Sequence, residues 1–120
     1  MIAVPAHLRI LVAVQPVDFR RGIDGLAQIC RQALQTNPMD GAIFVFVNRR
    51  ATSVKLLSYD GQGFWLAQKR LSTGRFKHWP KDASQAAQLL ESSQLHVLLR
   101  GGDPQSVHTA PCWRPLQAVG

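Results

Sequence analysis

The residues whose types and spacing most clearly suggest chemistry are basic side chains concentrated in about a quarter of the chain. Residues 49–81 hold eight of the 14 Lys and Arg residues and a single acid, Asp60. A cluster of this kind neutralises phosphates and releases counterions, which gives sequence-independent affinity for nucleic acid that depends strongly on salt. The predicted nucleic-acid-binding residues of this region are Arg49, Arg50, Lys55, Lys69, Arg70, Arg75, Lys77 and Lys81.

Aromatic side chains are interleaved with the last of these cations. Phe76, His78 and Trp79 lie among Arg75, Lys77 and Lys81, a pattern that predicts rings stacking on exposed bases. In the alternative interpretation the charges form a solvated strand edge that prevents sheet aggregation, and the aromatic rings belong to the core. The sequence leaves both interpretations open.

A second basic motif is "VDFRRGIDG". Arg20 and Arg21 precede Gly22 at the start of a predicted helix, where backbone N–H groups and the helix dipole attract phosphate. Alternatively, Asp18 pairs with one of these arginines or caps the turn. The motif is not a phosphate-binding P-loop, because it lacks the Lys-Ser/Thr ending. Arg20 and Arg21 are therefore further candidates for phosphate contact.

The segment "GFWLAQKRL" (63–71) is typical of a strand, with aromatic residues at its start and cations at its end. Side chains alternate between the two faces of a strand, so Lys69 and Arg70 point in opposite directions and do not form one bidentate patch. We expect Phe64 and Trp65 to be buried and the second half of the strand to emerge into solvent.

Catalysis has little support in the sequence. Metal-dependent strand cleavage needs two or three clustered acids, whereas Asp18, Asp60 and Glu91 lie at the ends of separate elements with no spacing that makes them converge. The histidines are isolated, and no serine or cysteine has a nucleophile-elbow context. We therefore predict no catalytic residue, no metal ligand and no cofactor, and a metal-dependent nuclease is the least favoured function.

Composition indicates a folded protein with an anionic partner. The 120 residues fit one domain, 46% are hydrophobic and the net charge is +7. Cys30 and Cys112 are not in metal-site spacing, which predicts free thiols and a reducing compartment. The apolar run "ILVAV" is too short to span a membrane and lacks signal-peptide features. We expect a soluble cytoplasmic protein with no membrane partner.

The predicted elements form an α+β fold. A buried strand begins within residues 8–18 and ends at Pro16, and apolar spacing predicts an amphipathic helix over 23–35 with a stop at Asn37-Pro38. Three strands follow as an antiparallel meander over 41–48, 53–60 and 63–71. The first of them is apolar on both faces and is expected to be central or covered.

The end of the chain has two possible arrangements. Residues 84–100 form either one helix or a short strand "AQLL" followed by a helix that starts near Glu91. Two layers, helix on sheet, bury the apolar face of the first helix. We expect residues 1–102 to form a single domain and residues 103–120 to form a flexible, proline-containing tail.

Four segments occur in an order typical of one known family: "PVDFRRGIDGL" (16–26), "GAIFVFVNRR" (41–50), "VKLLSYDGQGFWLAQKRL" (54–71) and "GRFKHWP" (74–80). Over roughly residues 8–100 the chain resembles the accessory protein encoded by the second open reading frame of insertion sequence 66 elements. This TnpB-type protein is distinct from the RNA-guided nuclease that shares its name. The resemblance favours a strand followed by a helix over residues 87–100.

The chain departs from the family pattern in three places. The family usually has Asp-Met-Arg-Lys-Gly at residues 18–22, its last helix ends in an acidic segment where this chain has Arg100, and its arginine-rich tail is reduced here to Arg114. The resemblance implies a non-enzymatic part in transposition beside a larger, element-encoded transposase. The expected partners are the transposase and a nucleic acid, with DNA favoured over RNA. The alternative function is that of a protein-interaction subunit whose basic face docks on the transposase or on another element-encoded protein.

Overall fold

A computed structural model describes residues 8–107 as five strands and two α-helices. In chain order these are β1 (Ile10–Ala13), α1 (Ile23–Gln32), β2 (Ile43–Val47), β3 (Ser53–Tyr59), β4 (Phe64–Arg70), β5 (Ala87–Leu90) and α2 (Ser92–Leu99), followed by a short 3-10 helix, η1 (Pro104–Ser106). The predicted α+β class is confirmed. At residues 87–99 the strand-then-helix arrangement is the one present.

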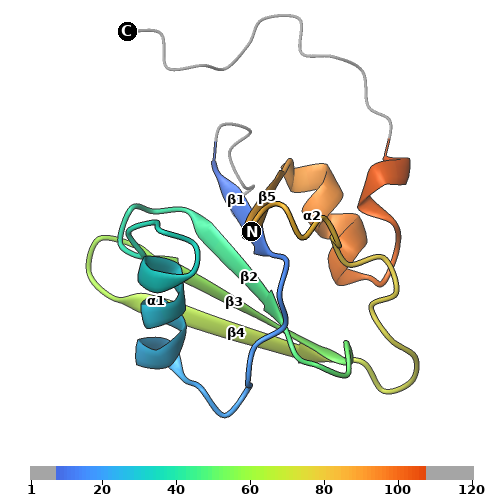
Figure 1. The fold of residues 1–120 in the computed structure, drawn as a ribbon, viewed down its shortest axis with the longest axis horizontal. Helices are drawn as coiled ribbons and strands as arrows, with labels where there is room; N and C mark the ends of the chain where they lie inside the picture. The colour runs from blue at the N-terminus through green and yellow to red at the C-terminus, as the bar shows by residue number, and fades with distance from the viewer. Residues whose placement is uncertain (1–7, 108–120) are drawn as a thin grey trace, which may run out of the picture.

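The five strands form one mixed sheet in the order β4-β3-β2-β1-β5. β2, β3 and β4 make the predicted antiparallel meander, and β5 runs antiparallel to β1. β1 and β2 are parallel neighbours joined through α1 (Figure 1), since a parallel pair needs a crossover connection. β1 and β2 therefore terminate at the same end of the sheet, which we call the carboxyl end.

Both faces of the sheet are covered, so the molecule has three layers where two were expected. On one face, Phe44 and Phe46 of β2 pack with Leu26 and Cys30 of α1. On the other face, Val45 and Val47 pack with side chains of α2 and of the segment after β4. β2 is thus buried on both sides, as its continuous apolar run predicted.

α1 follows the predicted apolar stripe but ends at Gln32, before the expected limit at residue 35. Gln35 has a left-handed backbone (φ 51°), so the chain turns away from the helix ahead of Asn37-Pro38. Cys30 is fully buried on this helix, and burial raises the pKa of its thiol to about 12. The thiol is therefore protonated and unreactive at neutral pH.

The expected tail begins with an ordered turn. The Asp103 side chain accepts a hydrogen bond from the backbone N–H of Gln105, and Pro104 is buried against the region of α2. The remainder of the predicted tail, with Cys112, Trp113 and Arg114, lies outside the described residues. Within residues 8–107, no helix has the length and apolarity needed to cross a membrane.

Candidate nucleic-acid interface

The carboxyl end of the sheet brings together three segments that carry arginines. The loop after β1 is joined to the end of β2, because the Val17 N–H donates to the Val47 carbonyl over 2.9 Å. The chain after β4 is joined to the β2–β3 turn, because the N–H groups of Leu71 and Phe76 donate to the carbonyls of Thr52 (2.9 Å) and Ala51 (2.7 Å). These backbone bonds hold Arg20 and Arg21, Arg49 and Arg50, and Arg70 and Arg75 at one end of the molecule.

The β2–β3 turn is organised by the side chain of Asn48. Its Oδ1 accepts hydrogen bonds from the N–H groups of Thr52 and Ser53 at 2.9 and 3.1 Å, and its Nδ2 donates to the Thr52 hydroxyl. Ala51 closes the turn with a left-handed backbone (φ 56°). The two residues between, Arg49 and Arg50, are consequently presented to solvent on a fixed backbone.

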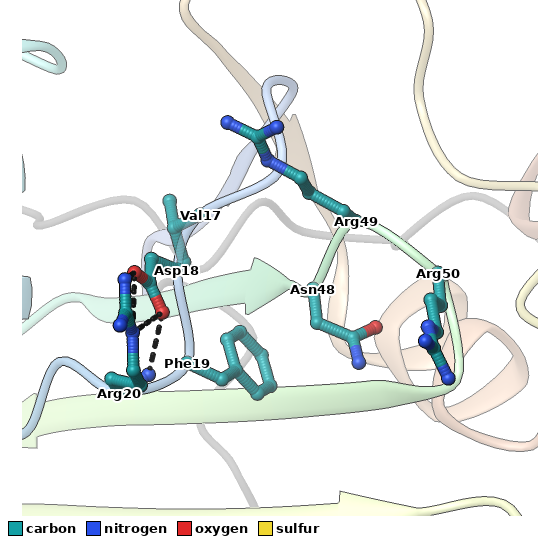
Figure 2. Close-up of a pocket in the computed structure, with 7 residues that line it drawn as sticks. All are labelled: Val17, Asp18, Phe19, Arg20, Asn48, Arg49 and Arg50. Atoms are coloured by element: carbon teal, nitrogen blue, oxygen red, sulfur yellow. Dashed lines mark hydrogen bonds and ion pairs between the residues drawn. The ribbon is translucent and has the colours of Figure 1, made fainter.

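Arg20, Arg49 and Arg50 line one shallow pocket of about 600 Å³. Figure 2 shows Arg20 on one side of it, joined to Asp18, and the Arg49–Arg50 turn on the other. Phe19 and Asn48 lie between them, and Val17 also lines the pocket. Three guanidinium groups against one carboxylate give this pocket a net positive charge, and Figure 2 shows the Arg49 and Arg50 side chains extending in opposite directions from their turn. Guanidinium groups are suited to phosphate by charge and by hydrogen-bond donors.

Asp18 is the acid in this pocket, and it pairs with Arg20. The Arg20 Nη2 and Nε lie 2.7 and 2.9 Å from Asp18 Oδ2, and the Arg20 backbone N–H donates to Oδ1 over 2.9 Å. These hydrogen bonds from Arg20 lower the pKa of Asp18 to about 2. Asp18 is therefore ionised at neutral pH and competes with any phosphate for the Arg20 guanidinium.

Lys55 does not reach solvent, which corrects its prediction as a nucleic-acid-binding residue. Only 6% of its surface is exposed. Its Nζ donates to the carbonyls of Phe19 and Arg21, both at 2.8 Å, and lies 4.9 Å from the centroid of the Phe19 ring. Strand alternation explains the burial, because Lys55 shares the α1-facing side of β3 with buried Leu57. Lys55 thus attaches the Arg20–Arg21 loop to the sheet.

The strand pattern in β4 separates Lys69 from Arg70, as alternation predicted. Lys69 lies on the face covered by α2, where its Nζ donates to the Leu99 carbonyl over 2.7 Å. Arg70 projects on the α1 side, beside the first residue of β3, Ser53. Both side chains are exposed, but only Arg70 continues the cationic surface at the carboxyl end on the α1 side.

The cations at 77–81 form a second group. Lys77, His78 and Lys81 are exposed and line a hollow that also contains Asp82, Asp103 and Pro104. None of the residues lining this hollow lines the Arg20–Arg49–Arg50 pocket. The basic region predicted over 49–81 is therefore divided between two surfaces, and the one at 77–81 includes two acids.

Phe76 and Trp79 are core residues, which corrects their prediction as base-stacking rings. They are only 2% and 7% exposed, and they contact each other edge to face with ring centroids 6.2 Å apart. The Trp79 indole N–H donates to the buried Ala13 carbonyl at 2.9 Å. Of the three predicted stacking residues, only His78 remains accessible.

Trp65 is exposed, which corrects the expectation that it is a core residue. It was expected in the core but is 69% exposed, because neither α2 nor the segment 71–86 covers the start of β4. Its indole N–H donates to Asp60 Oδ2 over 2.7 Å. Phe64, on the other face, is partly buried and packs edge to face on Tyr59 with ring centroids 5.0 Å apart.

The acids considered for catalysis do not come together. Asp18 lies at the carboxyl end, whereas Asp60 follows β3 and so lies at the opposite end of the sheet. Glu91 caps α2, and its side chain belongs to a capping box with Gln94. Among residues 8–107, no group of three or more His, Cys, Asp or Glu side chains is arranged to hold a metal ion.

Replacing Lys55 tests its role in attaching the arginine loop. Lys55→Met keeps most of the packing volume but leaves the Phe19 and Arg21 carbonyls without their donor, so we expect a loss of about 1–3 kcal/mol in the free energy of unfolding. Lys77→Met, at an exposed position, should change that value by less than about 0.5 kcal/mol. Urea unfolding followed by circular dichroism measures both. Equal effects of the two variants would contradict the proposed role.

Comparison with known proteins places the chain in a family. The family model described as "IS66 Orf2 like protein" matches residues 8–109. Two uncharacterized proteins of Sinorhizobium fredii (strain NBRC 101917 / NGR234) are similar along nearly their whole length: y4jC is 37% identical over 99% of this chain and 100% of its own, and y4hO is 38% identical over 92% and 93%. No solved structure matches. The chain therefore belongs to the IS66 Orf2-like family of transposition-associated accessory proteins.

Proposed function

We propose that this protein is a non-enzymatic accessory factor that binds DNA through the carboxyl end of its sheet during transposition. The observation that carries the proposal is the shared pocket of Arg20, Arg49 and Arg50. The same end of the molecule carries three further exposed arginines on segments that are hydrogen-bonded together, namely Arg21, Arg70 and Arg75.

The chemistry of this surface favours contact with the phosphate backbone. Guanidinium groups bind phosphate oxygens with two parallel hydrogen bonds, and exposed cations release counterions from the nucleic acid when they do so. The rings that would read bases by stacking, Phe76 and Trp79, are buried. Phe19, the ring inside the pocket, is partly buried and lies under the Lys55 ammonium. We therefore expect binding with little sequence preference.

A second candidate function uses the same arginines against protein. An acidic patch on the element-encoded transposase would complement the cationic pocket equally well in charge. The two functions are distinguished by co-purification of the transposase after nuclease treatment. A complex that survives nuclease but is abolished when Arg49 and Arg50 are replaced supports docking through this face, whereas a complex that nuclease abolishes supports a nucleic-acid bridge.

The salt dependence of DNA binding tests the location of the interface. The triple variant Arg49→Gln/Arg50→Gln/Arg75→Gln should bind duplex DNA more weakly, and its log–log salt slope should flatten by about 0.9 for each phosphate that the variant no longer neutralises. Fluorescence anisotropy with a labelled duplex over a salt series measures both quantities.

A matched control removes the same charge elsewhere. Arg31→Gln/Lys77→Gln/Lys81→Gln also lowers the net charge by three but leaves the carboxyl-end arginines in place, so its slope should stay close to that of the wild type. Equal weakening in the two triple variants would show that binding follows net charge rather than this surface. No measurable binding of the wild type at low salt would refute the DNA-binding function.

Breaking the Asp18–Arg20 ion pair should strengthen DNA binding rather than weaken it. Asp18→Asn keeps an oxygen for the Arg20 backbone N–H but frees the guanidinium and removes a negative charge from the pocket. We expect DNA affinity to rise by about two- to fivefold, the scale of a surface ion pair. Because Arg20 holds the pKa of Asp18 near 2, lowering the pH within the mildly acidic range should not reproduce this gain. Arg20→Gln in the Asp18→Asn background should remove it.

A further inference from the structure

β4 leaves one side of the sheet open for pairing. It pairs with β3 in an unbroken register from Tyr59↔Phe64 to Ser53↔Arg70, and within residues 8–107 no strand lies on its other side. The Asp60 N–H donates to the Gly63 carbonyl, and the Leu71 N–H donates to the Thr52 carbonyl. The odd-numbered residues of β4 therefore bond toward β3, and alternation directs the N–H and C=O groups of Phe64, Leu66, Gln68 and Arg70 outward.

The side chains of β4 are arranged so that one copy of the strand complements a second copy running in the opposite direction. The strand has the sequence Phe-Trp-Leu-Ala-Gln-Lys-Arg, with two aromatic residues at the start, two cations at the end and Ala67 at the centre. When a second copy of β4 runs antiparallel to the first and the two Ala67 residues face each other, Trp65 of each copy lies opposite Lys69 of the other. Phe64 of each copy then lies opposite Arg70 of the other. We propose that the protein forms a two-fold symmetric dimer in which the β4 strands of two copies pair antiparallel, with Ala67 on the axis.

The backbone hydrogen-bonding pattern fits this register. Ala67 bonds toward β3, so two facing Ala67 residues form a non-hydrogen-bonded pair, in which Cα atoms approach to about 4.5 Å. An alanine at the axis suits that close approach. Leu66 and Gln68, whose amides point outward, then exchange the ladder bonds with the second copy. A parallel pairing would instead set Lys69 beside Lys69, which repulsion disfavours.

Neighbouring registers do not form the aromatic–cation pairs. With Leu66 on the axis, Trp65 faces Ala67 and Phe64 faces Gln68. With Gln68 on the axis, Trp65 faces Leu71 and Phe64 faces Ser72. Of these three registers, only the one centred on Ala67 pairs both aromatic rings with cations, which are attracted to the faces of such rings.

The Trp65 side chain is already held in position for such a contact. It is 69% exposed, yet its indole N–H is bonded to Asp60, whose carboxylate also accepts from the N–H groups of Gln62 and Gly63. Lys69 lies on the same face, kept there by its bond to the Leu99 carbonyl. In the dimer, the ammonium of Lys69 from the second copy exchanges its bond to the Leu99 carbonyl for the Trp65 ring and the Asp60 carboxylate. A large exposed aromatic anchor is typical of interface centres.

This dimer shares Arg70 with the proposed DNA-binding end, but Trp65, Lys69 and Ala67 are not among the residues lining the Arg20–Arg49–Arg50 pocket, so its tests are made without nucleic acid. The other edge strand, β5, has four residues against seven in β4, and so offers a shorter ladder.

Sedimentation equilibrium of the full chain without nucleic acid tests the dimer. The wild type should be a dimer, and Trp65→Lys should weaken it by at least about tenfold, because the introduced lysine then faces Lys69 of the second copy. The exchange variant Trp65→Lys/Lys69→Trp should restore association, since it recreates both pairs in the same register. Leu89→Lys, at an exposed position of β5, is the control and should leave the dimer unchanged.

Cross-linking tests the register. In a Cys112→Ser background, Ala67→Cys should form a disulfide-linked dimer on mild oxidation, because the two Cα atoms lie within the range of about 4.4–6.8 Å that disulfides require. Gln68→Cys should cross-link poorly, because two such residues are diagonal neighbours about 7–8 Å apart. A wild type that stays monomeric would overturn the proposal. So would a dimer that tolerates Trp65→Lys, or one that gives no cross-link through residue 67.

Discussion

The parallel pairing of β1 with β2 is the constraint on which the rest of the molecule depends. Because these strands run parallel, both end at the same end of the sheet. The connection between them must therefore cross back to the other end, and α1, which makes this crossing, begins where β1 ends. The loop after β1 and the turn after β2 are consequently neighbours, although Arg20 and Arg49 are far apart in the sequence. The meander then returns the end of β4 to the same place and adds Arg70 and Arg75.

This arrangement separates cations that hold the structure together from cations that face solvent. Lys55 is buried and supplies two hydrogen bonds to the loop carrying Arg20 and Arg21. Burying a charge is unfavourable unless it is well paired, so both carbonyl partners are needed. Among residues 8–107, the exposed arginines at the carboxyl end form no comparable hydrogen bonds or ion pairs, apart from Arg20, which pairs with Asp18. They can therefore exchange water for phosphate without disturbing the fold.

Local patterns predicted the elements well and the layers less well. Apolar spacing located α1, alternation located the meander, and the doubly apolar "IFVFV" run marked β2 as the covered strand. The parallel β1–β2 pair and the second helical layer depend on contacts between distant segments, which no local period encodes. The family resemblance, rather than periodicity, favoured the strand at residues 87–90, because four residues are too few to distinguish a strand from a helix.

The candidate site, like the fold, was predicted only in part from local sequence patterns. Counting cations identified the arginines, but burial decided which residues are accessible, and burial depends on which face of β3 or β4 lies under another layer. Lys55 could have been recognised as buried from its shared face with Leu57. The exposure of Trp65 could not, because it results from how far α2 and the 71–86 segment reach over the sheet.

DNA binding at the carboxyl end of the sheet is tested most directly by backbone amide NMR of the protein titrated with a short duplex. We predict the largest shift changes in residues 18–21, 48–52 and 70–75, with little change near Lys77, Lys81 or the start of β4. Changes confined to residues 77–81, or spread evenly over the surface, would contradict binding at this end.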